Sequence, residues 1–117
     1  MNRPLRKSSL SEAQSCLVAL LQIVNFGRIE GLQIRAGQPI FDPPPLVVRK
    51  LRTGADNQRR PEADLEDFYL KEPVIEMLDA LADLRDGEVR SIDVRHGLPI
   101  SIEIEYTTNP SGGLHYA

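Results

Sequence analysis

The side chains best suited to chemistry are two histidines, one cysteine and several closely spaced carboxylates. His96 and His115 lie far apart in the sequence, so a metal site would need carboxylates that the fold brings to one of them. Cys16 would need a neighbouring base to act as a nucleophile, and Glu12 is the one acidic helical neighbour. We therefore expect Cys16 to be a packed or half-buried structural thiol, His96 to be a turn residue, and the chain to have no metal, cofactor or catalytic residue.

Paired carboxylates occur in two places. Asp79 and Asp83 are four residues apart and share one face of a predicted helix, but that face lies opposite the apolar one and is expected to be solvated. Glu103 and Glu105 alternate with isoleucines along a predicted strand, where cross-strand ion pairs account for them. Since the sequence also lacks the glycine-rich motifs that bind phosphates, we interpret the protein as a non-enzyme.

Two arginines are the first candidates for binding. Arg35 and Arg95 each precede a glycine-containing turn, and two guanidinium groups brought together by the fold would clamp an anion or a partner's carboxylates. The alternative, which we favour, is that each arginine pairs with an acidic neighbour across its own turn.

The segment from Arg49 to Arg60 supplies a second basic group, led by Arg49, Lys50 and Arg52. A basic strand and loop of this kind suits the phosphates of a nucleic acid. The net charge of −3 and the aromatic content of 5% count against that class, because single-strand binders stack bases on aromatic side chains. A nucleic-acid-binding regulator is therefore the alternative to a protein-binding module.

Charge is divided unevenly along the chain. Residues 1–60 contain ten Lys/Arg and four Asp/Glu, whereas residues 61–117 contain four Lys/Arg and thirteen Asp/Glu. This asymmetry is typical of a nucleic-acid-binding face or a self-complementary dimer, although halves that neutralise each other in the folded molecule explain it as well. No apolar run approaches the roughly 18 residues of a membrane span. With one cysteine and no disulfide, we expect a cytoplasmic bacterial protein with no membrane partner.

The elements that must position these residues come as two similar halves. Residues 17–40 recur without a gap at residues 77–100, with six identities in 24 aligned positions. Glycine and proline are among the identities, and these residues carry backbone conformation as well as hydrophobicity. The identical pairs are Leu21/Leu81, Gly27/Gly87, Arg35/Arg95, Gly37/Gly97, Pro39/Pro99 and Ile40/Ile100.

Each half begins with a predicted amphipathic helix. Apolar residues recur at helical spacing over residues 10–24 and again over residues 74–84. Ser9 and Glu12 fit a capping box at the start of the first helix. A glycine follows each helix at a position where a left-handed C-terminal cap is expected, and these glycines are Gly27 and Gly87.

Each helix is followed by a predicted hairpin with the same irregularity. The apolar residues of its first strand change parity once, so a bulge is needed to keep them on one face, at Glu30–Gly31 and at Arg90–Ser91. Residues 35–38 and 95–98 are the expected turns, with glycine in the left-handed position.

The first return strand is interrupted by the run Asp42-Pro43-Pro44-Pro45. Proline cannot donate to a ladder, so residues 39–41 are expected to be short or at an edge, and the strand resumes over residues 46–51. The run is also a candidate ridge for a partner, but stiffening of the edge is the simpler interpretation.

Together these elements predict an α+β fold, namely a duplicated αββ unit with a four-stranded antiparallel sheet and two helices packed on one face. We expect a flexible N-terminus, one domain of two repeats joined by a loop with a short helical turn at residues 65–70, and a flexible tail. The corresponding ranges are 1–8 for the N-terminus, 9–106 for the domain, 9–52 and 72–106 for the repeats, 53–71 for the connection and 107–117 for the tail.

Each half resembles the small bacterial YezD-like domain, a short helix followed by a hairpin with a spaced glycine and aliphatic pattern. The resemblance covers roughly half of the chain and does not include residues 43–45 or 53–70. It implies a small cytoplasmic protein whose single-copy relatives pair as the two halves of this chain do, and it transfers no functional residue. The matching residues are Gly27, Ile29, Leu32, Ile34 and Gly37, and then Gly87, Val89, Ile92, Val94 and Gly97.

The sequence therefore favours a non-enzymatic module that binds another macromolecule. The expected partner is a protein or a second copy of the chain, bound through the sheet edges or the open sheet face. The residues expected to bind are Arg35, Arg95, Arg49, Lys50 and Arg52.

Overall fold

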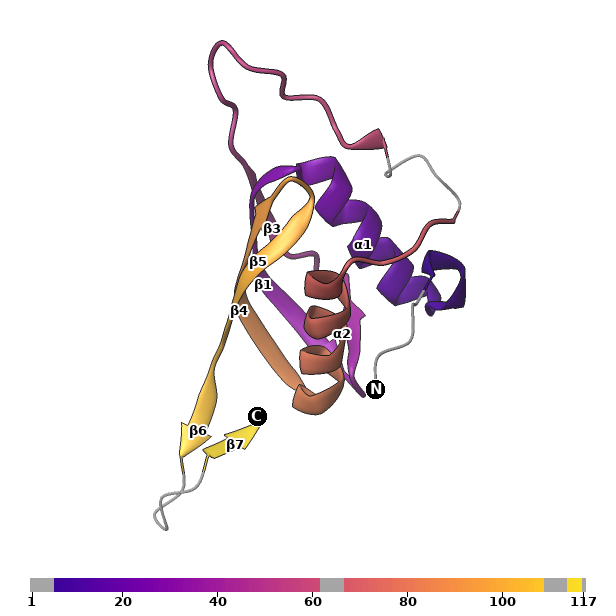
Figure 1. The fold of residues 1–117 in the computed structure, drawn as a ribbon. Helices are drawn as coiled ribbons and strands as arrows, with labels where there is room; N and C mark the ends of the chain where they lie inside the picture. The colour runs from indigo at the N-terminus through magenta and orange to yellow at the C-terminus, as the bar shows by residue number, and fades with distance from the viewer. Residues whose placement is uncertain (1–5, 62–66, 109–113, 117) are drawn as a thin grey trace.

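Two helices and a five-stranded antiparallel sheet form an α+β architecture (Figure 1). The computed structural model describes residues 6–61, 67–108 and 114–116. Both helices lie against the same face of the sheet, and the opposite face is open to solvent. The arrangement follows from the one-sided apolar patterns of the strands, because each strand buries one face only.

Helix α1 spans Glu12–Val24 and helix α2 spans Glu72–Leu84, as the apolar spacing predicts. Proline lies in the first turn of α2, where its missing N–H costs no helical hydrogen bond. The core fills the space between the helices and the covered sheet face. The helices contribute Leu17, Val18, Leu21, Val24, Val74, Met77, Leu78, Leu81 and Leu84, and the strands contribute Ile29, Leu32, Ile34, Val89, Ile92 and Val94.

The capping box of α1 is formed by Ser11 and Gln14, and the predicted pair Ser9 and Glu12 was wrong. Both pairs have the same spacing of three residues. Ser9 is instead the last residue of a short 3-10 helix, η1 (Lys7–Ser9). The backbone is extended at Leu10, before α1 begins.

The sheet has the strand order β2-β1-β4-β5, and β3 also pairs with β1. The two longest strands, β1 and β4, lie side by side in the centre and pair antiparallel from Phe26 opposite Arg95 to Ile34 opposite Gly87. The strand bounds are β1 Phe26–Arg35, β2 Gln38–Ile40, β3 Leu46–Arg49, β4 Gly87–Arg95 and β5 Leu98–Ile104.

The fifth strand arises because the proline run divides the first return strand. β2 pairs with the C-terminal half of β1 and β3 pairs with its N-terminal half, with residues 41–45 looping between them. The second return strand, β5, is one continuous strand that pairs with β4 from Val89 to Arg95. The expected count of four strands therefore becomes five, for the reason that the sequence indicated.

Both predicted bulges are confirmed. The pairing of β4 with β5 shifts register between Val89 and Ser91, which leaves Arg90 as the extra residue. Gly31 has φ +73°, and the buried positions of β1 change parity across it, from Ile29 to Leu32. Each bulge keeps the apolar residues of its strand on the covered face.

The two hairpin turns are confirmed as left-handed at both central positions. Ala36 and Gly37 have φ values of +53° and +76°, and His96 and Gly97 have +55° and +72°. Such turns match the right-handed twist of the strands that they join. His96 is therefore a turn residue, as the sequence predicted.

Gly27 and Gly87 do not cap the helices, contrary to the prediction. The residues at the helix ends with positive φ are Asn25 (+62°) and Arg85 (+67°), one position after the last helical residue. Gly27 lies inside β1, where a Cβ atom would lie 2.0 Å from the Val48 carbonyl oxygen. The close approach of β3, and not a helix cap, therefore accounts for glycine at position 27.

The remaining segments differ from simple flexible connections. Residues 67–70 are not helical, and the rest of the predicted turn at 65–70 lies outside the described residues. Tyr69 forms an isolated bridge with Arg6, which attaches the N-terminal segment to the chain before α2. Within the predicted tail, β6 (Tyr106–Thr108) pairs with β7 (Leu114–Tyr116). Residues 1–5, 109–113 and 117 of the predicted flexible ends lie outside the described part of the chain.

Candidate functional site

The loop that follows β3 is organised around the side chain of Asn57. Its Oδ1 accepts the backbone N–H of Arg52 at 2.8 Å, and its Nδ2 donates to the carbonyl oxygens of Arg52 and Ala55, both at 3.0 Å. The guanidinium group of Arg52 in turn donates to the Asp56 carbonyl at 2.6 Å. The polar loop predicted from the sequence is therefore held in one conformation, with its cations at defined places.

This loop is attached to the C-terminal end of α1. The Asn25 amide donates to the Gln58 carbonyl at 2.9 Å, and the backbone N–H of Arg60 donates to the Gln22 carbonyl at 3.0 Å. The C-terminal end of a helix carries partial negative charge, so the basic loop is electrostatically favoured there.

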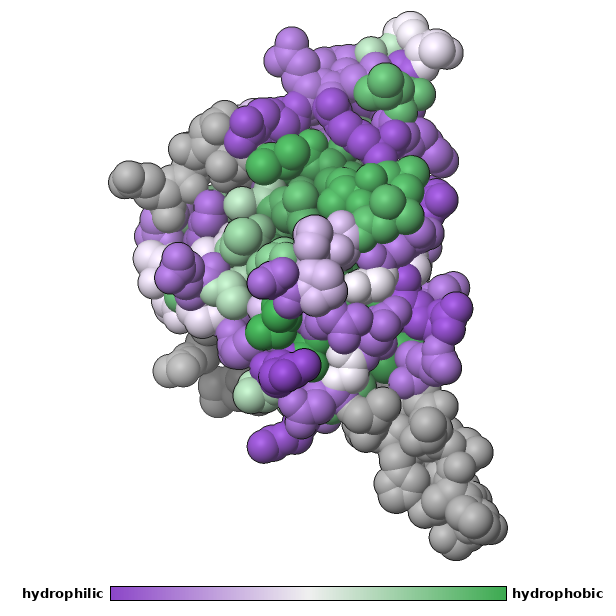
Figure 2. All heavy atoms as spheres, turned by 180° about the vertical axis from the view of Figure 1, so that it is seen from behind, coloured by the Kyte–Doolittle hydropathy of each residue, from purple (hydrophilic) through white to green (hydrophobic). Residues whose placement is uncertain are grey.

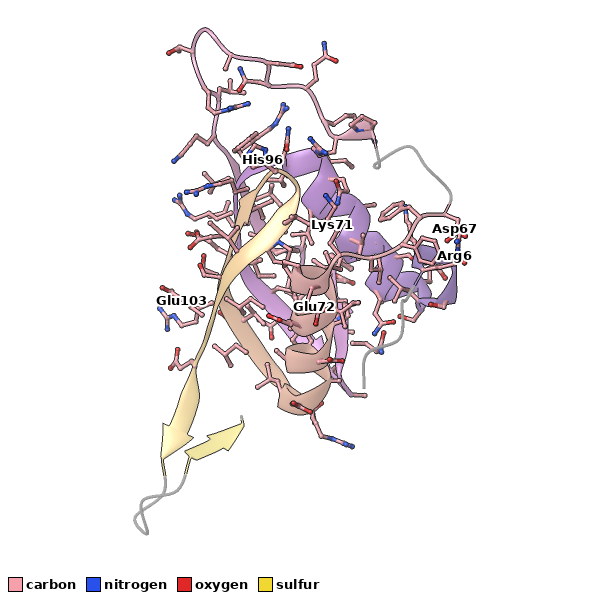
Figure 3. The ribbon with its side chains drawn as sticks, viewed as in Figure 1. Arg6, Asp67, Lys71, Glu72, His96 and Glu103 are labelled. Atoms are coloured by element: carbon pink, nitrogen blue, oxygen red, sulfur yellow. The ribbon has the colours of Figure 1, made fainter. Side chains whose placement is uncertain are left out.

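Arg52 packs against the aromatic ring of Phe26. The guanidinium carbon lies 3.8 Å from the ring centroid, and the His96 ring meets Phe26 edge-on with centroids 4.8 Å apart. A cation over an aromatic face contributes roughly 0.5–1 kcal/mol at an exposed site. Phe26 thus joins the start of β1, the loop after β3 and the turn after β4. Figure 3 shows His96 in that turn, at one end of the sheet.

A hollow of about 400 Å³ opens on the uncovered sheet face beside Phe26. Arg28, Lys50 and Arg95 line it, and they come from β1, the end of β3 and the end of β4. Asp93 is the one acidic residue in its lining and accepts the Ser101 hydroxyl at 2.8 Å. Its volume is within the range of ligand-binding pockets.

A second hollow, of about 180 Å³, lies on the other side of Phe26 and is lined by Arg52, Arg59, Arg60 and His96 among others. Arg49 lies beside it and donates a hydrogen bond to the Asn57 carbonyl. We call the cations around these hollows the basic end. Its members are Arg28, Arg49, Lys50, Arg52, Arg59, Arg60 and Arg95.

Four of the five predicted binding residues belong to the basic end, and Arg35 does not. Arg95 lies opposite Phe26 at the start of β1, whereas Arg35 ends β1 nine residues later. At about 3.3 Å per residue the two arginines are about 30 Å apart, so they cannot clamp one small anion. The clamp hypothesis failed because equivalent hairpin corners of an antiparallel pair lie at opposite ends of it.

The favoured alternative for these arginines was also wrong. Neither Arg35 nor Arg95 forms an ion pair or hydrogen bond through its side chain within the described ranges, and Lys50 likewise has no such partner there. Of the two glutamates predicted to form cross-strand ion pairs, Glu105 does so, with Arg90, whereas Glu103 has no ion pair within the described ranges. The pKa of Arg90 is raised by this hydrogen bond with Glu105.

The other reactive side chains lie apart from the basic end. Asp79 and Asp83 are exposed on α2, as predicted. Cys16 is exposed and not packed, because the buried stripe of α1 passes through its neighbours Leu17 and Val18. Where side chains are described, no three of histidine, cysteine, aspartate and glutamate gather as metal ligands.

Sequence reasoning missed Arg28, which lines the hollow on the open sheet face together with Lys50 and Arg95. Its signal was present, because Arg28 has the opposite parity to the buried Ile29 and therefore faces the open side of the sheet. The N-terminal cation Arg6 does not belong to the basic end. Arg6 pairs with Asp67 at 2.6 Å, on the side of α1 away from His96 (Figure 3).

No helix in the described ranges is both long and apolar enough to cross a bilayer. Comparison of the chain with protein-family models, with curated proteins and with solved structures found no match in any of the three.

Proposed function

We propose that this protein is a non-enzymatic binding module whose basic end recognises an acidic segment of a partner protein. The observation that carries the proposal is the convergence of Arg28, Lys50 and Arg95 around one hollow on the open sheet face. These residues are distant in sequence, and local helix or strand geometry alone would not gather them. Guanidinium and ammonium groups in a shared concavity are suited to carboxylate recognition.

The charges of this hollow are available for a partner. Lys50 and Arg95 have no side-chain ion pair or hydrogen bond in the part of the chain that the structure describes. Arg28 is partly compensated, because its Nε donates to Glu30 at 2.6 Å. An acidic peptide lying across the hollow would therefore gain two uncompensated cations at once.

The contacts of the Phe26 ring favour a protein partner over a nucleic acid. This is the aromatic ring of the basic end, and Arg52 lies over its face while His96 meets its edge. Single-stranded nucleic acids are bound by stacking bases on open aromatic faces. With this ring engaged within the protein, side-chain charge is the main means of recognition that the basic end offers.

The test is a titration of the full chain with a fluorescently labelled glutamate-rich peptide, followed by anisotropy at several salt concentrations. We expect Arg95→Ala and Lys50→Ala each to weaken binding roughly 5- to 20-fold, as for a partly exposed charged contact. Arg35→Ala is the matched control, since it removes the same side chain at the equivalent hairpin corner about 30 Å away. Equal losses in Arg35→Ala and Arg95→Ala would contradict the proposal.

A nucleic-acid-binding regulator is the second candidate. The number of cations between Arg49 and Arg60 favours it, because hydrogen bonds of Asn57 hold their loop beside the hollow. A single-stranded DNA of the same charge as the peptide distinguishes the two candidates. Tighter binding of the DNA, with log K falling steeply with log salt concentration and loss in Arg49→Ala and Arg52→Ala, would support the second candidate over the first.

We also propose that the fold arose by internal duplication of an αββ unit. The chain would then correspond to two copies of the YezD-like domain. Three observations support it. The helices begin and end sixty residues apart, at positions 12 and 72 and at 24 and 84. The positive φ values recur at the same offset. The backbone N–H of Gly37 donates to the Arg85 carbonyl at 2.8 Å and that of Gly97 to the Asn25 carbonyl at 3.0 Å, a reciprocal pair of contacts.

A cytoplasmic location belongs to the same proposal. Its support is the single cysteine, which is unpaired and exposed on α1, as is usual where thiols are kept reduced. Fractionation of the native cells with an antibody to the chain tests it directly.

A further inference from the structure

The outer edge of β3 is unpaired. β3 pairs with β1 on one side and with no other described strand on the other. The backbone N–H of Lys50 donates to the Phe26 carbonyl at 2.7 Å, which fixes the alternation of the ladder. The amides of Leu46 and Val48 therefore face β1, and those of Val47 and Arg49 face outward.

This edge is also where exposed apolar side chains gather. Leu46 is 60% exposed and Val47 41%, and beside them Leu51 is 66% and Ile23 on α1 is 40% exposed. The view from behind shows a continuous apolar area on this side of the molecule (Figure 2). Exposed apolar side chains next to unpaired backbone groups are a template for strand addition.

The other sheet edges carry the features that discourage such pairing. β2 has Pro39 in its centre and is followed by the proline run. β5 has Pro99 near its start and Glu103 near its end, and Glu105 follows it. Proline removes an outward donor, and charged side chains on an edge strand discourage its pairing with another edge. Among the described edge strands of the five-stranded sheet, β3 alone contains neither a proline nor a carboxylate within its own bounds.

We propose that two copies of this chain pair through β3, antiparallel across a two-fold axis at Val47. In this register Val47 faces Val47 of the second copy, and Leu46 faces Val48. The outward amide and carbonyl of each Val47 form a reciprocal hydrogen-bonded pair, and the amide of each Arg49 donates to the carbonyl of Pro45. This pairing extends the antiparallel sheet continuously through both molecules and is distinct from the partner that the basic end recognises.

The side chains in this register complement one another. Leu46 and Val48 lie on the open face, opposite Glu30 and Arg28 of β1. In the dimer these apolar side chains of the two copies therefore contact each other, next to the charged side chains of β1. Val47 lies on the covered face, opposite Ile29, and the two Val47 side chains meet there. Cross-strand pairs of branched aliphatic residues are favourable contacts on a sheet.

The charges that flank β3 also suit an antiparallel partner. Arg49 and Lys50 end the strand, while Asp42 precedes it beyond the prolines. Antiparallel pairing places Arg49 and Lys50 of each copy toward Asp42 of the other copy. No cation faces the same cation of the second copy, so the two-fold arrangement avoids like-charge contacts.

The association is tested by light scattering and sedimentation of the full chain over a concentration series. We expect a reversible dimer at micromolar concentrations, and we expect Leu46→Lys and Val47→Pro each to raise its dissociation constant by roughly 30-fold or more, through lost apolar contact or lost hydrogen bonds. Val47→Pro leaves the bonds between β3 and β1 intact, because the Val47 amide faces outward. Ile100→Lys is the matched control, since Ile100 is a similarly exposed (52%) isoleucine of β5.

The register is tested by cross-linking in a Cys16→Ser background, because the native cysteine is exposed. Leu46→Cys and Val48→Cys proteins should form a mixed disulfide when combined under mild oxidation, since they occupy facing positions about 4.5 Å apart at Cα. Each protein alone should cross-link far less. A monomer throughout the concentration series would overturn the proposal, as would loss of the dimer in Ile100→Lys but not in Leu46→Lys, or cross-linking without preference for the combined proteins.

Discussion

The backbone N–H of Gly97 donates to the carbonyl oxygen of Asn25 at 3.0 Å, which joins the turn between β4 and β5 to the end of α1. The two segments approach so closely that a side chain at position 97 would collide with neighbouring atoms. A Cβ atom on Gly97 would lie 2.5 Å from Oε1 of Gln22 and 2.9 Å from Cγ of Arg60, and φ is +72°. An alanine at this position would therefore have a strained backbone conformation and would have to displace the side chains of Gln22 and Arg60.

Gly97→Ala is predicted to lower the free energy of unfolding by about 2–4 kcal/mol, from left-handed strain together with displacement of Gln22. Urea denaturation measures the change. Gly54→Ala is the control, because Gly54 has a similar φ of +76° but nothing within 4 Å of the added Cβ. It should cost about 1–2 kcal/mol, the strain alone. Equal effects of the two substitutions would show that the packing argument is wrong.

Local patterns in the sequence predicted much of this fold. Apolar spacing located α1 and α2, and the change of parity located the bulges near Gly31 and Arg90. The proline run located the break between β2 and β3. These features depend on neighbours in the sequence, and that is why they were visible there. The capping box was misplaced by two residues because two serine-led patterns overlap and only the path of the preceding turn selects one.

The basic end could be predicted only in part. Arg49, Lys50 and Arg52 are adjacent in sequence and were visible as a basic group. Their meeting with Arg95 depends on the register of β1 with β4, which aligns segments almost seventy residues apart. The same register separates Arg35 from Arg95 and removes the predicted clamp. Long-range register is set by the whole core, and no local pattern contains it.

Gly27→Ala is predicted to detach β3 from β1. The added Cβ would lie 2.0 Å from the Val48 carbonyl oxygen, which belongs to backbone and cannot move aside without breaking the ladder. We expect a loss of about 3 kcal/mol or more in the free energy of unfolding, and faster hydrogen exchange at the Val48 amide. Gly31→Ala is the control, because its nearest neighbour would be a side-chain oxygen of Glu88 at 3.9 Å. Protection of Val48 that survives Gly27→Ala would contradict this account.

Asn57→Ala is predicted to loosen the basic loop. The substitution removes three hydrogen bonds, two to the backbone of Arg52 and one to that of Ala55, so the Arg52 guanidinium should lose its fixed place over Phe26. We expect faster hydrogen exchange at the Arg52 amide and about threefold weaker binding of the glutamate-rich peptide. Gln58→Ala is the control, because the bonds made by Gln58 use its backbone. Equal exchange rates in the two variants would count against Asn57 as the organiser of the loop.

Attachment of the N-terminal segment is predicted to depend on pH through Asp67. The hydrogen bond from Arg6, together with the backbone N–H of Ser8 at 3.0 Å, lowers the pKa of the Asp67 carboxyl below its usual 3.8. A carboxyl with a lowered pKa contributes its stabilisation fully above the usual pKa and loses it as the pH falls through the folded-state value. The Ser8 amide should therefore stay protected from hydrogen exchange above pH 3.8 and lose protection only below it.

Asp67→Asn separates this effect from general acid unfolding. The amide cannot pair with Arg6 as a carboxylate does, so the variant should show weak protection of Ser8 at neutral pH and little further change on acidification. The backbone bond from Lys7 to the Phe68 carbonyl, at 2.8 Å, is a second probe of the same attachment. Asp79→Asn is the control, because Asp79 is exposed on α2 and no hydrogen bond or ion pair involves it in the described ranges. If Ser8 remains equally protected in both variants at neutral pH, the Arg6–Asp67 pair does not hold the segment, and the bridge between Arg6 and Tyr69 does so instead.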